Sequence, residues 1–208
     1  MDIIYQLPAA AEERPAAPPT KSPQQQQAFL KNLVGATLYD KMVVLDGDGN
    51  VVKINCNKLS STEYEQLTFD IIHLKSLLNL TEIWLTGTEV TGDIIHLKSL
   101  PNLTKIGLNG TGITGVTGDI AHLNSLRNLT RIWLYETDVF GDIIHLKSLL
   151  NLTEINISTT GVFGDITHLK SLPKLIDISL GETSVTCDED AFYNYRNNAG
   201  LKKCELLL

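Results

Sequence analysis

The stretch LTEIWLTGTEVTGDIIHLKSLPN, from Leu80 to Asn102, is one copy of a unit that recurs along most of the 208-residue chain. When the positions of this unit are numbered from 1, apolar residues occupy places 1, 4, 6, 11, 15, 18 and 21. One unit is too short to bury its own apolar face, so successive copies must stack and share a core. The units begin at Val51, Leu80, Leu103, Leu129, Leu152 and Leu175, with a truncated one at Leu201.

Several places of the unit have a direct physical reading. Isoleucine and leucine at places 4 and 6 alternate with polar residues, which is the period of a half-buried strand. Threonine at place 9 can bond a turning backbone, and glycine at place 13 permits a bend. Aspartate at place 14 precedes a short helix, and its carboxylate can accept hydrogen bonds from the free backbone amides at the start of that helix. Each unit therefore predicts a strand, a turn and a short helix.

The pattern resembles the plant-type subclass of the leucine-rich repeat family, with its motif L-x-x-L-x-L-x-x-N-x-L-x-G-x-I-P. Here threonine replaces the ladder asparagine, and G-D-I replaces G-x-I-P. The resemblance covers residues 51–208. It implies an α/β solenoid, with a curved parallel sheet on the concave face and short helical or 3-10 turns on the convex face.

The chain divides into four parts on this basis. Residues 1–27 are rich in Ala, Pro, Glu and Gln and predict a disordered tail. Residues 28–50 resemble the N-terminal cap of such arrays, with a helix in AFLKNLVGATL and then a hairpin strand around DGDGN, which lacks the spacing of a calcium loop. Residues 51–200 hold six repeats, and residues 201–208 are a truncated last repeat or a C-terminal cap.

Composition restricts the partners and the compartment. A net charge of −7 argues against nucleic acid, and no apolar run is long enough to span a membrane. The first residues do not resemble a signal peptide, and three scattered cysteines suit a reduced compartment, so an intracellular location is favoured. A Cys187–Cys204 bridge stays open. Secretion also stays open, because Asn-Leu-Thr acceptors recur at Asn79, Asn102, Asn128 and Asn151.

All five histidines occupy place 17 of their units, in the predicted short helices. Stacking should align them in a column, which could be a metal site, a proton store, a docking stripe or a by-product of copying. A closed zinc site needs about four ligands in tetrahedral array, which a straight column does not offer. The copied structural unit is the favoured explanation, and we expect no metal or cofactor. The column comprises His73, His96, His122, His145 and His168.

Function should lie at places that vary on a fixed scaffold, which on the concave sheet are the outward places 3, 5 and 7. Both tryptophans of the chain are at place 5, and Trp, Tyr and Arg dominate binding hot spots. The alternative is that they stack over Gly107, which lies between them. The predicted partner-binding residues are Trp84, Lys105, Asn109, Arg131, Trp133, Tyr135, Glu154 and Asn156.

A second candidate surface is the flank of the solenoid. Phe140 and Phe163 share place 12 of adjacent units and could form an apolar pair, or could pack against the preceding loop. A three-residue insertion within GITGVTGD should bulge beside them, and insertions in repeat arrays map to loops.

No nucleophile with its base and no phosphate-binding glycine loop appears, so we do not expect an enzyme. The resemblance implies a protein-recognition module that binds its partner on the concave face. The first alternative is a structural subunit or spacer in a larger assembly. A lesser one is ice or mineral binding through threonine columns at places 2 and 9, since Thr81, Thr104, Thr130 and Thr153 repeat at place 2.

Overall fold

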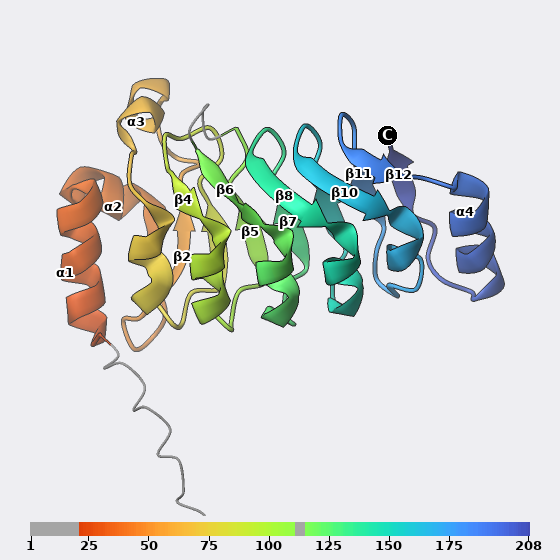
Figure 1. The fold of residues 1–208 in the computed structure, drawn as a ribbon. Helices are drawn as coiled ribbons and strands as arrows, with labels where there is room; N and C mark the ends of the chain where they lie inside the picture. Colours follow the sequence, from red (N-terminus) through yellow and green to blue (C-terminus); the bar gives the residue numbers. More distant parts are fainter. Residues whose placement is uncertain (1–20, 111–114) are drawn as a thin grey trace, which may run out of the picture.

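The structure is a computed structural model that describes residues 21–110 and 115–208. Each repeat forms one lap of a solenoid, and the laps stack side by side with their short helices aligned along one side (Figure 1). This is the α/β leucine-rich-repeat solenoid that the repeat predicts. Within the described ranges, no helix is long and apolar enough to cross a membrane.

The main sheet has eight strands in the order β1-β2-β3-β5-β7-β9-β11-β13. All neighbours run parallel except β1 and β2, which form an antiparallel hairpin. Place 3 pairs with place 3 from lap to lap, beginning with Lys53 against Glu82, so the predicted phase of the unit is confirmed. The parallel strands are β2 (Val51–Asn55), β3 (Glu82–Trp84), β5 (Lys105–Gly107), β7 (Arg131–Trp133), β9 (Glu154–Asn156), β11 (Asp177–Ser179) and β13 (Glu205–Leu207).

A second parallel sheet, which the sequence did not predict, covers places 10 to 14 of the units. Valine at place 11 points into the core, and Val90, Val139 and Val162 are fully buried. These strands are short and four of the five contain glycine, so their alternation is too weak to indicate a strand. In the order β12-β10-β8-β6-β4 they are β12 (Ser184–Thr186), β10 (Gly161–Asp165), β8 (Asp138–Asp142), β6 (Val116–Asp119) and β4 (Gly92–Asp93).

The aspartate at place 14 caps each short helix, as predicted. Asp93 Oδ1 accepts from the backbone N–H of Ile95 at 2.7 Å, and the other four aspartates make the same contact. The carboxylate also lies against the glycine of the next lap: a Cβ added to Gly141 would lie 2.3 Å from Asp119 Oδ1. The 3-10 helices are η1 (Ile71–Ser76), η2 (Ile94–Ser99), η3 (Ile120–Ser125), η4 (Ile143–Ser148) and η5 (Ile166–Leu169).

Two polar columns tie each lap to the one before it. The place-2 threonines donate to backbone carbonyls of the preceding lap, as in Thr104 Oγ1 to Thr81 O at 2.9 Å. Asparagines at the end of the unit do the same, as in Asn102 Nδ2 to Leu78 O at 2.9 Å. These bonds explain why Asn-Leu-Thr is copied with the unit. The hydroxyls that would present a threonine array at place 2 are therefore already bonded to backbone.

The N-terminal end is closed by α1 (Pro23–Val34), α2 (Ala36–Met42) and β1 (Val43–Leu45). The prediction of a disordered tail up to residue 27 is wrong for residues 23–27. A capping box between Ser22 and Gln25 and a proline in the first turn start the helix there. The single predicted helix is two helices, because Gly35 has φ +83° and breaks it. The predicted hairpin of β1 and β2 is confirmed, and residues 1–20 lie outside the described ranges.

Both end units depart from the repeat. The first lap contains the extra helix α3 (Ser61–Gln66), and the sixth ends in α4 (Glu189–Asn198) where a 3-10 helix would stand. Strand β13 then pairs with β11 so that Glu205 lies opposite Asp177. The register places the last strand two residues later than the alignment from Leu201 predicts. Residues 201–208 therefore contribute one strand to the main sheet but do not keep the phase of a repeat.

Candidate functional site

The two tryptophans lie on the outer face of the main sheet, as predicted, on either side of a glycine. Trp84, Gly107 and Trp133 are aligned in the register of β3, β5 and β7. The Trp84 ring lies over Gly107, where an added Cβ would be 2.4 Å from its Cε3 atom. The two ring centroids are 5.1 Å apart with planes at 74°, and both side chains are half-buried. Trp84 thus covers the glycine and meets Trp133 edge to face, and both rings still reach the surface; we call the pair the aromatic platform.

Charged residues at place 3 border this platform in a row across the strands. Glu82 binds Lys53 at 2.9 Å and Lys105 at 3.4 Å, and it accepts from Trp84 Nε1 at 3.2 Å. Burial of the Glu82 carboxyl raises its pKa, whereas hydrogen bonds from Lys53 and Trp84 lower it. The lowering effects together are larger than the effect of burial, so the pKa of Glu82 lies below its usual value. Sequence reasoning left Glu82 out of the site, although it is the residue that orients the Trp84 indole.

The charge of this row reverses along the solenoid. From β2 to β7 it contains three cations and one carboxylate, whereas from β9 to β13 it contains three carboxylates. Arg131 and Glu154 form an ion pair of 2.9 Å at the boundary. Beyond it, Asp177 lies in register with Glu154 on one side and with Glu205 on the other. The outer face therefore has a basic half and an acidic half, with the aromatic platform in the basic half.

The two predicted residues at place 7, Tyr135 and Asn109, differ in exposure. Tyr135 is half-buried just after β7, and Asn156, at place 5, is half-buried at the end of β9. Asn109 is 1% exposed, and its Oδ1 accepts from Thr86 Oγ1 at 3.0 Å. The prediction that Asn109 contacts a partner is therefore wrong, because its side chain is buried and hydrogen-bonds the Thr86 hydroxyl of the preceding lap. The other predicted residues, Lys105, Arg131 and Glu154, are half-buried at place 3.

The flank pair lies on the second sheet. Phe140 on β8 and Phe163 on β10 are each 49% exposed, so they do not pack under the preceding loop. Gly161 pairs with Phe140 in the register, and a Cβ there would lie 3.1 Å from the Phe140 Cβ. The surface of Phe140 and Phe163 is the flank patch. Most of the predicted insertion falls on residues 111–114, which lie outside the described ranges.

The histidines lie in the 3-10 helices, on the side of the solenoid away from the main sheet. They are exposed or half-buried, and His73 packs against Phe29 with ring centroids 6.0 Å apart. No group of three or more His, Cys, Asp or Glu within residues 21–110 and 115–208 is arranged to hold a metal ion. The five imidazoles are thus spread along the described 3-10 helices, one to each copy of the unit.

The threonines at place 9 face inward. Thr88 is buried and donates to Leu85 O at 2.7 Å, and Thr137 and Thr160 make the same bond to the carbonyl three residues earlier. Thr111 lies outside the described ranges. Because the described place-9 hydroxyls and those of place 2 are bonded to backbone, neither column presents a free hydroxyl array to ice or mineral.

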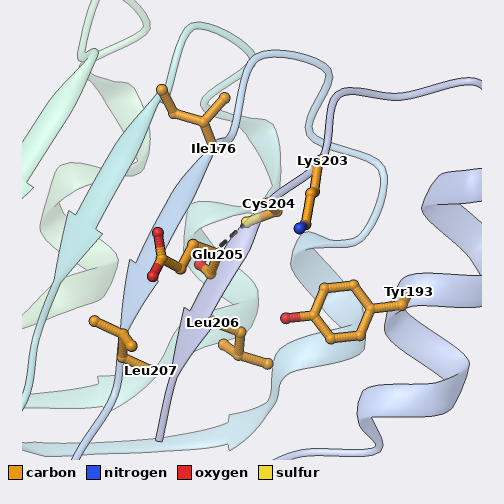
Figure 2. Close-up of a pocket in the computed structure, with 7 residues that line it drawn as sticks. All are labelled: Ile176, Tyr193, Lys203, Cys204, Glu205, Leu206 and Leu207. Atoms are coloured by element: carbon orange, nitrogen blue, oxygen red, sulfur yellow. Dashed lines mark hydrogen bonds between the residues drawn. The ribbon is translucent and has the colours of Figure 1, made fainter.

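A hollow of about 490 Å³ lies at the C-terminal end, where Tyr193 reaches from α4 toward β13 (Figure 2). Burial raises the pKa of Cys204 in its wall to about 11, which keeps it a thiol and a poor nucleophile. All three cysteines are free, so the Cys187–Cys204 bridge is not formed. The hollow is lined by Ile176, Tyr193, Lys203, Cys204, Glu205, Leu206 and Leu207.

No family model and no curated protein matches the sequence. Among solved structures, the chain is similar to the plant peptide hormone receptor RGFR1 in complex with RGF2. The TM-score is 0.56 and the identity 23%, and the match covers 68% of this chain and 23% of that one. It is also similar to the LRR ectodomain of the receptor kinase SOBIR1 from Arabidopsis thaliana, with a TM-score of 0.61, 17% identity, and coverage of 79% and 94%.

A plant ice-binding protein is a further structural neighbour, with a TM-score of 0.57, 13% identity, and coverage of 82% of this chain and 66% of that one. The chain spans less than a quarter of the length of the hormone receptor. With identities this low, the likeness concerns the fold. The fold is that of a leucine-rich repeat protein of the plant type.

Proposed function

We propose that the protein is a non-catalytic recognition module that binds a protein partner on the outer, concave face of the main sheet. The observation that carries this proposal is the aromatic platform: two tryptophans at the surface of a rigid sheet, held by Gly107, Glu82 and each other. Fixed aromatic side chains beside arginine and tyrosine are the usual composition of a binding hot spot. The centre of the surface is Trp84, Arg131, Trp133 and Tyr135.

The charge row suggests how a partner lies on this face. An extended segment running along the solenoid axis would place an acidic part over Lys53, Lys105 and Arg131. Its apolar or aromatic anchor would sit on the tryptophans, and a cationic part would reach Asp177 and Glu205. Complementary potentials of this kind fix orientation and speed association. The peptide hormone receptor named above is itself in complex with RGF2, which agrees with a recognition role for this fold.

The test compares two double variants of the full chain. Trp84→Ala/Trp133→Ala removes the platform, and Phe140→Ala/Phe163→Ala removes an equally apolar pair from the flank patch. Partners captured by the wild-type chain are identified by mass spectrometry and their affinities measured with purified protein. We expect the tryptophan variant to bind at least about thirtyfold more weakly, since hot-spot truncations cost about 2 kcal/mol or more. The phenylalanine variant should bind like the wild type.

A third variant guards against misfolding of the tryptophan variant. Gly107→Ala keeps both tryptophans but must displace the Trp84 ring, because the new Cβ would overlap it. We expect Gly107→Ala also to weaken binding of the partner, with a circular dichroism spectrum that shows an intact fold. Undiminished binding by both platform variants would refute the proposed site. Loss of binding in the flank variant alone would move it to Phe140 and Phe163.

We further propose that the protein works outside the cell, although the sequence favours an intracellular location. The support is the likeness of the fold to receptor ectodomains. Fractionation of the source material should recover the chain in the secreted or surface fraction. Recovery in the cytosol would contradict this location without affecting the binding site.

A further inference from the structure

The charge of the molecule is segregated between its two sides. Five ten-residue segments follow the capping aspartates and form the 3-10 helices and the turns after them: residues 71–80, 94–103, 120–129, 143–152 and 166–175. They contain six lysines or arginines, all five histidines and no aspartate or glutamate. Because the whole chain carries −7, the other residues together carry −13. We call the six cations the basic stripe: Lys75, Lys98, Arg127, Lys147, Lys170 and Lys174.

The basic stripe is available to a ligand. None of its members forms an ion pair with any carboxylate in the described ranges, and five of the six are exposed. For five of the six, the nearest negative charge along the chain is the capping aspartate, which accepts a backbone amide at the start of the 3-10 helix; for Lys174 it is Asp177. A six-residue 3-10 helix is about 12 Å long, which exceeds the distance over which physiological salt screens charges. Lys170 is the exception, because it follows the four-residue η5 and its charge contributes to lowering the pKa of Asp165.

The surface along the basic stripe contains two similar hollows. Between η1 and η2 lies a hollow of about 330 Å³ lined by Lys75, Ile95, His96, Lys98 and Ser99. Between η3 and η4 lies another, of about 210 Å³, lined by Asn124, Ile144, His145, Lys147 and Ser148. Each combines an isoleucine wall, an imidazole, a serine hydroxyl and a lysine. Two hollows of the same chemistry in one line suit a polymer with a repeating structure better than a single small molecule.

From the charge segregation and the repeated hollows we infer that this side of the solenoid binds a linear sulfated polysaccharide. The isoleucine walls fit the apolar face of a sugar ring, the serine and imidazole groups fit its hydroxyls, and the lysines fit its sulfates. Five of the six cations are lysines, which act as point charges, whereas planar carboxylates are better paired by arginine. The five segments contain no Phe, Tyr or Trp, the large aromatic side chains that form the stacking platforms of single-strand binders, which favours the polysaccharide over single-stranded nucleic acid.

The test uses the full chain, immobilised, with dextran sulfate as the probe. The triple variant Lys75→Gln/Lys98→Gln/Lys147→Gln removes three stripe cations. The matched control Lys58→Gln/Lys202→Gln/Lys203→Gln makes the same change in net charge at three exposed lysines elsewhere. We expect the stripe variant to bind dextran sulfate at least about tenfold more weakly than the wild type, and the control to stay within about twofold. Binding should weaken steeply with added salt, because each contact displaces a counterion.

Three further arms identify the ligand class. Unsulfated dextran of equal length should not bind, polygalacturonate should bind more weakly than dextran sulfate, and vesicles containing phosphatidylserine should bind no more than neutral vesicles. Equal loss in the stripe and control variants would reduce the effect to net charge and overturn the inference. The inference would also be overturned if the wild-type chain did not bind dextran sulfate, or if it bound the phosphatidylserine vesicles more tightly than dextran sulfate. The Trp84→Ala/Trp133→Ala variant should bind dextran sulfate normally, so this inference stands or falls independently of the concave site.

Discussion

Each end of the solenoid is closed around one buried polar side chain, and the two side chains differ in kind. At the N-terminal end, Gln26 is 4% exposed, accepts from Val51 N at 3.2 Å and donates to Lys21 O at 3.0 Å. At the C-terminal end, Arg196 on α4 is 2% exposed and carries a charge. It donates to the backbone carbonyls of Lys170, Leu172, Leu175 and Lys202, at 2.7 to 3.3 Å.

The difference follows from the direction of the polar columns. Thr and Asn side chains of each lap donate to carbonyls of the lap before it, as Ser99 does to Lys75 O at 3.2 Å. The first lap therefore receives its donors from the second, whereas the fifth lap's turn carbonyls face a sixth lap that has become α4. Buried carbonyls without a donor are costly, so the C-terminal end needs several donors in one place. The guanidinium, with five N–H groups, supplies them.

The largest effect should come from removing that donor set. Arg196→Met keeps the volume but leaves three or four carbonyls unsatisfied, so we expect the free energy of unfolding to fall by about 3–4 kcal/mol. Urea denaturation measures the loss, and hydrogen exchange should show the amides of β11 and β13 opening first. Arg127→Met is the matched control, because Arg127 is exposed and makes one carbonyl bond, to Ser148 O. Equal losses in both variants would show that Arg196 does not close the end.

An interior junction should be the next most sensitive. Gly141 has φ +112°, and a Cβ there would overlap the Asp119 carboxylate, so Gly141→Ala should cost about 2–3 kcal/mol in unfolding free energy. Gly87→Ala provides the comparison: φ is +70°, but nothing lies within 4 Å of the new Cβ. It should cost only the backbone strain, about 1 kcal/mol. If thermal and urea unfolding give the two variants equal stability, the overlap with the aspartate is relieved at no cost.

The smallest effect is expected at the N-terminal end. Gln26→Leu removes one acceptor and one donor, so the unfolding free energy should fall by about 1–2 kcal/mol. Gln24→Leu, at an exposed place on the same helix, should change it by less than about 0.5 kcal/mol. A loss at Gln26 as large as that at Arg196 would contradict the directional account of the two ends. The two measurements therefore test one idea from opposite sides.

The sequence predicted those parts of the fold that one lap specifies by itself. The alternation at places 4 and 6 located the main sheet, and the aspartate before each IIHLKSL-like segment located the caps. The outward direction of Trp84 and Trp133 follows from the same alternation. The second sheet was missed, because strands of two to five residues containing glycine are recognisable only when adjacent laps pair.

What the sequence could not predict depends on contacts between laps. Asn109 is at place 7, where the repeat predicts a surface residue, yet its side chain is buried and accepts a hydrogen bond from Thr86 of the preceding lap. Arg196 forms no ion pair with any carboxylate in residues 21–110 and 115–208, and its helix, rich in Asp, Glu and Asn, does not indicate from the sequence that this side chain is buried. The ion pairs of Glu82 likewise involve distant parts of the chain, since Lys53 is 29 positions before it and Lys105 is 23 positions after it. Such contacts require the stacked solenoid.

The fit between four of the five capping aspartates and the glycine of the following lap has a consequence for how such a chain can change in length. Half of the fit belongs to one copy and half to the next, so a gene that gains or loses one whole copy restores every junction automatically. The unit that begins at Leu103 is three residues longer than its neighbours, and its Gly118 still lies against Asp93. Whole copies, or additions that fall before the glycine, are therefore the changes in length that leave every junction intact.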